Sequence, residues 1–175
     1  FVDSDDWACL DMYEKLYGKI TKSKYEIVYS EYQTAQSTQG PFEVIKRNID
    51  VDWNSSIDEI KKHYIIETNP VWSGIYSNQL FNDFNIYFPE QLFYEDNYIV
   101  PLLVAHADHI GKVNEPLINY NIGNESVTRS FNNESYFHRL ETAKSLLAES
   151  KKRNLVKYKE EIEYNFIKLY YINTS

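Results

Sequence analysis

The sequence has a single cysteine, Cys9, and its longest apolar run, residues 99–105, has seven residues and is interrupted by Pro101. One thiol excludes an internal disulfide and a zinc site built from thiolates, and this cysteine usage is compatible with a reducing compartment. A membrane-spanning helix needs about 20 apolar residues, so the run is far too short to cross a bilayer. The sequence therefore predicts no transmembrane helix.

Cationic residues are also scarce: 18 Lys and Arg face 26 Asp and Glu, the net charge is −8, and only four of the cations are Arg. A protein that binds nucleic acid through its phosphates needs clustered Lys and Arg, so this balance argues against a nucleic-acid partner. The 175 residues are 43% hydrophobic and 25% charged, which is ordinary globular usage. This composition predicts one domain, or one domain with a helical extension.

Strand-like and helix-like segments alternate over the first 130 residues, and only helical patterns follow. Ser56 and Glu59 have the spacing of a capping box, which marks the start of one helix. The pattern predicts an α/β fold. The expected strands are 1–3, 25–32, 42–49, 110–113 and 117–122, with 86–88 extended and 70–76 a loop; the expected helices are 9–22, 56–65, 79–82, 97–107, 134–152 and 156–172.

An acidic turn, Asp3-Ser4-Asp5-Asp6, follows the strand expected at residues 1–3. Carboxylates on a loop at the carboxyl end of a strand are hard oxygen ligands, suited to Mg²⁺ or Mn²⁺ that carries substrate phosphates. A solvated turn or a helix cap is the alternative interpretation. An EF-hand calcium loop does not fit, because Trp7 and Ala8 stand where an oxygen ligand and a glycine are required.

A second acidic pair, Glu95-Asp96, lies between the aromatic pair Phe93-Tyr94 and an apolar helix. A carboxylate held beside apolar surface at a helix start can be positioned, and its pKa adjusted, for work as a general base. Capping of the helix that follows is the alternative interpretation.

The order and separation of these motifs resemble the second half of a family 2 glycosyltransferase. The resemblance covers roughly residues 1 to 130, with the acidic turn similar to the DxD motif of that family and Glu95-Asp96 similar to its ED motif. The other segments that carry it are Phe88-Pro89-Glu90, Ile110-Gly111, Asn114-Glu115-Pro116-Leu117 and Ser126-Val127-Thr128.

The resemblance implies a GT-A fold with a mixed sheet, in which residues 1–130 form the second half of the catalytic domain and 131–175 a helical C-terminal extension. The nucleotide-binding half would precede residue 1, so we expect the 175 residues alone to lack useful transferase activity. By the family pattern Asp5 is the metal ligand, Asp3 supports the metal or the sugar nucleotide, and Asp96 is the catalytic base. Glu95 would shape the acceptor site, and transfer would invert the anomeric centre by a single displacement.

The partners implied are a nucleotide-sugar donor and a saccharide or lipid-linked saccharide acceptor, with Mg²⁺ or Mn²⁺ as cofactor, in bacterial cell-surface polysaccharide synthesis. The expected location is the cytoplasm, with peripheral association at the inner face of the membrane left open. The rival interpretation is a noncatalytic fragment that serves as an interaction module. Convergence of Asp5 and Asp96 on one cleft would favour the enzyme.

The chain departs from the family pattern in one aromatic segment. Many relatives carry a Trp-Asn-Lys-Leu-Tyr-like segment ahead of the ED motif, whereas this chain has Trp72-Ser73-Gly74-Ile75-Tyr76 and lacks the lysine. Trp72 or Tyr76 could stack on a sugar or base of the donor, and core packing is the alternative. His138, on the helix after Thr128, is a minor candidate for approach to the diphosphate.

Overall fold

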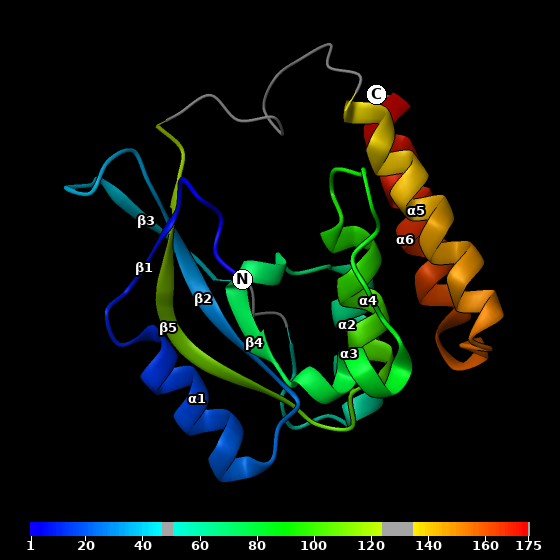
Figure 1. Ribbon diagram of the computed structural model, residues 1–175, viewed down its shortest axis with the longest axis horizontal. Coiled ribbons are helices and arrows are strands. Elements are labelled where there is room, and N and C mark those ends of the chain that lie inside the picture. The colour runs from blue at the N-terminus through cyan, green and yellow to red at the C-terminus, as the bar shows by residue number, and fades with distance from the viewer. Residues whose placement is uncertain (47–50, 124–134, 175) are drawn as a thin grey trace.

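The computed structural model describes residues 1–46, 51–123 and 135–174, which form a mixed five-stranded sheet with helices on both faces. Helix α1 covers one face of the sheet, whereas α2, α3 and α4 lie on the other, and α5 and α6 form an outer layer against them (Figure 1). The predicted α/β class with a mixed sheet and C-terminal helices is confirmed. No helix within these three ranges is both long and apolar enough to span a bilayer.

The sheet has the order β1-β5-β2-β3, and β4 pairs with β2 on the same edge as β3. Strands β2 and β5 run parallel, and every other pair is antiparallel. The strands are β1 (Trp7–Ala8), β2 (Ile27–Ala35), β3 (Phe42–Ile45), β4 (Gly74–Tyr76) and β5 (Ile110–Asn121). The helices are α1 (Met12–Ser23), α2 (Ile57–Ile66), α3 (Asn78–Phe84), α4 (Asp96–His106), α5 (Ser135–Lys152) and α6 (Lys159–Thr174), with 3-10 turns η1 (Val71–Ser73) and η2 (Val156–Tyr158).

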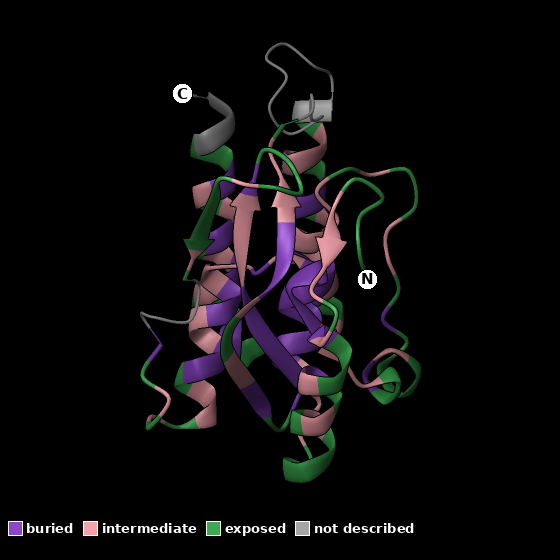
Figure 2. Ribbon diagram, turned by 90° about the vertical axis from the view of Figure 1, so that its left-hand side faces the viewer, coloured by how far each residue is buried: buried purple, intermediate pink, exposed green. Residues whose placement is uncertain are grey.

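Alternation along β2 divides the apolar side chains between two cores. Ile27 and Tyr29 point into the larger core, which α2, α4, α5 and α6 complete, whereas Val28 points into the smaller core beneath α1. Buried residues therefore run along the middle of the sheet and the helices behind it (Figure 2). Since Leu146 and Ile162 belong to the larger core, α5 and α6 are packed into the same body as α2 and α4. The predicted domain boundary at residue 130 lies outside the described residues.

The predicted strand at residues 1–3 is wrong. Phe1 is 54% exposed, and the chain turns at residues 4 and 5 before Trp7 pairs with Asn119 in β1. Phe1 makes aromatic contacts instead of forming a strand, because its ring packs edge-on against Phe88 with 5.0 Å between the centroids. The position of β1 is determined by its pairing with β5, and no local sequence pattern indicates this pairing.

Several further element boundaries differ from the expectation. The predicted strands 110–113 and 117–122 form one strand, β5, because a bulge opposite Glu31 absorbs the residues around Pro116. The segment 70–76, expected as a loop, contains η1 and β4. Helix α1 starts at Met12 rather than residue 9. The helix start predicted at Ser56 is confirmed, because the Ser56 hydroxyl caps α2 by accepting a hydrogen bond from the Glu59 amide at 3.3 Å. The end of the strand expected at 42–49 lies outside the described residues.

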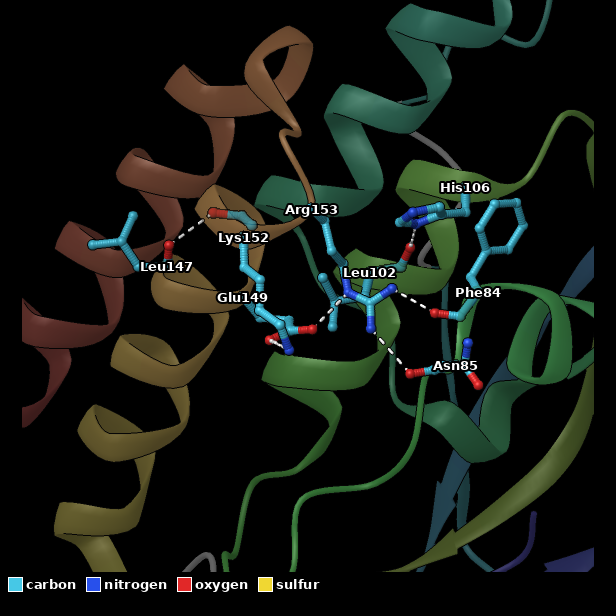
Figure 3. Close-up of polar contacts among 9 residues, drawn as sticks. Phe84, Asn85, Leu102, His106, Leu147, Glu149, Lys152 and Arg153 are labelled. Carbon is cyan, nitrogen blue, oxygen red and sulfur yellow. Dashed lines mark hydrogen bonds and ion pairs between the residues drawn. The ribbon is translucent and has the colours of Figure 1, made fainter.

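Arg153, just beyond α5, ties the helical extension to the end of α3 (Figure 3). Its guanidinium donates hydrogen bonds to the carbonyls of Phe84 at 2.6 Å and Asn85 at 3.0 Å, and its Nε donates to Glu149 at 2.9 Å. Asn85 ends α3 in the left-handed conformation, with φ of 49°. A cation therefore occupies the C-terminal carbonyls of α3, where the helix dipole favours positive charge.

We expect Arg153→Ala to lower the free energy of unfolding by about 2 kcal/mol, because it removes charge-assisted hydrogen bonds from a site that is only 17% exposed. Thermal unfolding followed by circular dichroism measures the change. Lys152→Ala is the matched control, because the Lys152 side chain is 77% exposed and should contribute less than about 0.5 kcal/mol. Equal effects of the two substitutions would contradict the assigned role of Arg153.

Candidate active site

The acidic turn, residues 3–6, is anchored to the end of β5. The Asp6 amide donates to the Asp3 carbonyl at 3.2 Å, which closes the turn. Asp6 Oδ1 accepts a hydrogen bond from the Asn121 amide at 2.8 Å, and the Asn121 side-chain amide donates to the Asp5 carbonyl at 3.2 Å. The Asp3 and Asp5 side chains are left exposed. The backbone of the turn is thus held from behind while two carboxylates remain accessible.

Asp6 is a site residue to which the sequence alone assigns no role of its own. Its pKa is raised to about 6, mainly by burial; the hydrogen bond from Asn121 opposes this rise, and the charges of Asp5 and Asp3 contribute to it. Its Oδ2 is buried and has no hydrogen-bond partner among the described residues. Asp6 therefore anchors the turn, whereas Asp3 and Asp5 remain available as ligands. This difference depends on the pairing of β1 with β5, which brings Asp6 to Asn121.

Asp96 is the first residue of α4, and its side chain does not cap that helix. Glu95 stands at the N-cap position, and it makes no side-chain capping hydrogen bond either. Asp96 Oδ1 instead accepts a hydrogen bond from the Val71 amide of η1 at 3.0 Å. The capping role that the sequence leaves open is therefore wrong for this pair. The Asp96 carboxylate therefore connects the start of α4 to η1, the segment that leads into β4.

The environment of Asp96 favours its protonated form. Its pKa is raised to about 7, with burial as the main cause; the hydrogen bond from Val71 opposes this rise, and the charges of Glu95 and Asp3 contribute to it. A carboxylate with a pKa near neutral can accept a proton in one step and release it in the next at physiological pH. Asp96 thus has the electrostatic character that a general base requires.

The acidic turn and the start of α4 share one electrostatic environment. Burial raises the pKa of Asp3, and the charge of Glu95 is the next cause, followed by that of Asp5. The Phe1 ring, which precedes the turn, also lies 6.3 Å from Tyr76 of β4 and 6.2 Å from Phe81 of α3. Asp3 therefore links the carboxylate of Asp5 with those of Glu95 and Asp96 in one acidic cluster.

Two tyrosines form the buried floor next to Asp96. The rings of Tyr29 and Tyr76 meet edge-on at 6.0 Å, and neither hydroxyl makes a well-oriented hydrogen bond within the described part of the chain. Burial raises the pKa of both phenols well above the usual value, and the charge of Asp96 raises it further. Both phenols therefore stay neutral, and the acidic cluster is bordered by two uncharged aromatic side chains.

Trp72 packs in the core rather than facing the acidic cluster. It is 6% exposed, its ring stacks on Tyr120 at 5.5 Å, and Tyr32 meets it edge-on at 5.0 Å. These contacts support the packing alternative for Trp72 and leave little ring surface for a donor base. Tyr76, the other aromatic of this segment, lies in the floor beside Asp96.

The described residues contain no group of three or more His, Cys, Asp or Glu side chains arranged to hold a metal ion. The exposed pair Asp3 and Asp5 offers two carboxylates. Mg²⁺ is commonly bound by one or two carboxylates together with substrate phosphates, rather than by a cage of protein ligands. The donor set therefore fits a cation that arrives with a diphosphate. The Ser126–Thr128 segment of the resemblance lies outside the described residues.

The fold of this chain matches that of S. aureus TarS. Fragment 1–349 of TarS in complex with UDP-GlcNAc superposes with a TM-score of 0.64 at 17% identity, over 95% of this chain and 48% of that chain. The longer TarS structure gives a TM-score of 0.58 at 18% identity, over 95% of this chain and 28% of that chain. A further TarS 1–349 structure contains UDP.

In sequence, the chain is similar to Glycosyltransferase GlyA of Streptococcus pneumoniae serotype 4. The two are 27% identical over 156 residues, which cover 83% of this chain and 22% of GlyA. No family model matches the sequence. The chain thus spans less than half the length of each of these relatives.

Proposed function

We propose that this chain is the metal-binding and acceptor-binding half of an inverting glycosyltransferase of the family 2, GT-A type. The observation that carries the proposal is the acidic cluster, in which Asp3 connects the exposed carboxylate of Asp5 with Asp96. The similarity to GlyA and the TarS fold support the same reaction class. An interaction module would not require a carboxylate with a near-neutral pKa beside an accessible acidic turn.

In the proposed reaction Asp96 accepts the proton of an acceptor hydroxyl. The oxygen of that hydroxyl forms a bond to the anomeric carbon, and the bond from this carbon to the diphosphate oxygen breaks, so that the configuration inverts. Asp5 would hold Mg²⁺ or Mn²⁺ with support from Asp3, and the bound cation would stabilise the charge of the departing diphosphate. Glu95, beside the base, would orient the acceptor.

The donor and acceptor classes follow from the same site. TarS structures contain UDP-GlcNAc and UDP, so a UDP-sugar is the first donor to test. The acceptor would be a saccharide or a lipid-linked saccharide in cell-surface polysaccharide synthesis, at the cytoplasmic side of the membrane. The nucleoside would bind to a preceding half of the domain, which residues 1–130 complete.

The experiment uses a polypeptide in which a nucleotide-binding half precedes residue 1. Titration calorimetry with UDP, in the presence and absence of Mn²⁺, should show metal-dependent binding. Asp5→Asn should weaken it by at least about tenfold, because it removes a charged ligand. Asp83→Asn, which changes an exposed carboxylate of α3, is the matched control and should bind normally.

Two results would count against this metal assignment. Binding of UDP that does not depend on Mn²⁺ would remove the need for a cation at the acidic turn. Equal weakening by Asp5→Asn and Asp83→Asn would show that general charge, rather than coordination at residue 5, determines the affinity.

A further inference from the structure

The loop between α3 and α4, residues 85–95, ends at the acidic pair and contains unusual backbone conformations. Gln91 has φ of 59° and Tyr94 has φ of 62°. This left-handed region is unfavourable for residues with a side chain, so surrounding contacts must hold them there. Tyr94 immediately precedes Glu95, and its conformation therefore sets the direction in which the chain enters α4.

Helix α5 supplies the contacts that hold this loop. His138 Nδ1 accepts a hydrogen bond from the Phe93 amide at 3.1 Å. The single proton of the Thr142 hydroxyl is shared between the His138 carbonyl of its own helix at 2.7 Å and the Phe93 carbonyl at 3.1 Å. Thr142 is fully buried, and the Phe93 and His138 rings lie 5.2 Å apart. Both backbone polar groups of Phe93 are thus bound by side chains of one helix.

The same helix also contacts the next residue of the loop. The Arg139 guanidinium lies 4.3 Å from the centre of the Tyr94 ring, within the range of a cation–π interaction. Thr142 lies four positions after His138 and three after Arg139, and residues at these spacings are neighbours on the surface of a helix. Consecutive loop residues, Phe93 and Tyr94, are therefore held by a single face of α5 directly before Asp96.

We infer that His138 and Thr142 are positioning residues for Asp96, and that α5 thereby takes part in building the proposed active site. The inference rests on the proposed function of Asp96, but neither residue is expected to touch a substrate. Asp96 is oriented by the backbone at residues 94–96 and by the hydrogen bond from the Val71 amide. Releasing Phe93 lets Tyr94 leave its left-handed conformation, and this rotates Asp96 away from Val71.

Amide hydrogen exchange measured by NMR tests this coupling without any substrate. His138→Ala and Thr142→Val should speed exchange at both Phe93 and Val71 by about tenfold or more, because the opening of the loop breaks both hydrogen bonds. His138→Asn should restore slow exchange, since the Asn Oδ1 can accept in the place of Nδ1. Lys144→Ala, elsewhere on α5 at an exposed pair with Glu141, is the control and should leave exchange unchanged.

Fast exchange at Phe93 with normal exchange at Val71 would overturn the inference, because His138 and Thr142 would then hold the loop without positioning Asp96. Unchanged exchange at Phe93 in Thr142→Val would also overturn it, and this variant serves where His138→Ala fails to fold. In the longer polypeptide, His138→Ala should lower kcat about tenfold with the donor KM unchanged, and His138→Asn should recover it. Absence of transfer in the unsubstituted polypeptide would refute the proposed function, whereas the exchange at Val71 still decides the positioning role.

Discussion

Replacing Asp96 with Asn is expected to slow sugar transfer by about 10²- to 10⁴-fold while making the fold more stable at pH 8. Asn has the shape of Asp, and its side-chain oxygen can still accept the Val71 hydrogen bond that Asp96 receives at 3.0 Å. It cannot accept a proton from an acceptor hydroxyl. The loss should therefore fall on kcat, measured as release of the nucleoside diphosphate, with the donor KM nearly unchanged.

The gain in stability follows from the raised pKa of Asp96. Below pH 3.8 the carboxyl is protonated in both the folded and the unfolded chain, so Asp and Asn differ little. Between 3.8 and about 7 only the folded chain holds the proton, so the free energy of unfolding of the natural protein falls as the pH rises. Above about 7 both states are ionised, and the full penalty of the buried charge is present.

The size of this effect is bounded by the pKa difference between the two states. A shift from 3.8 to about 7 corresponds to at most about 4 kcal/mol. Asp96 is only half-buried by its accessible surface, and contact with solvent reduces the effect to about 1–2 kcal/mol. Urea unfolding at pH 4, 6 and 8 measures how the advantage of Asn over Asp grows with pH. Asp3 and Asp6 also have raised pKa values, but both proteins contain them, so the comparison isolates residue 96.

Asp83→Asn, on the exposed side of α3, should change neither kcat nor the pH dependence of stability. Normal transfer by Asp96→Asn would refute its assignment as the base. A pH-independent difference in stability between the natural protein and the Asp96→Asn variant would mean that burial does not raise the pKa of this carboxyl.

The candidate site could be predicted from the sequence in its components but not in its assembly. Asp5 and Asp96 are visible as two short acidic motifs, each compatible with an ordinary turn or helix cap. Their shared environment depends on the attachment of Asp6 to Asn121, which lies 115 residues away in the chain. Long-range strand pairing creates this contact, and no local periodicity reports it.

The elements of the fold show the same limit. Helices such as α2, with its Ser56 cap, follow from spacing and local hydrogen bonding, which sequence patterns record directly. The continuous strand β5 does not, because Pro116 looks like a break until the bulge opposite Glu31 accommodates it. The left-handed conformation of Tyr94 is hidden for a related reason, since a bulky residue adopts it only under tertiary contacts from α5.

Gly74 is a position at which a single methyl group is expected to destabilise the fold strongly. A Cβ atom there would lie 2.5 Å from the Val28 carbonyl oxygen and 3.0 Å from the Tyr29 ring, because β4 approaches β2 closely at this point. Its φ of −160° is ordinary extended backbone, so the restriction comes from space rather than from torsion. Since the contact is with backbone, β4 itself must move, and we expect Gly74→Ala to lower the free energy of unfolding by about 2–4 kcal/mol.

A glycine-to-alanine substitution at Gly18 is the control, and it should change the free energy of unfolding in the opposite direction. No atom lies within 4 Å of a Cβ at Gly18 in α1, so Gly18→Ala should raise the free energy of unfolding by about 0.5–1 kcal/mol through helix propensity. Urea unfolding of the two variants measures both changes, and a neutral Gly74→Ala would refute the close approach of the strands. Displacing β4 would further draw Val71 away from Asp96, so Gly74→Ala should impair transfer as well as folding.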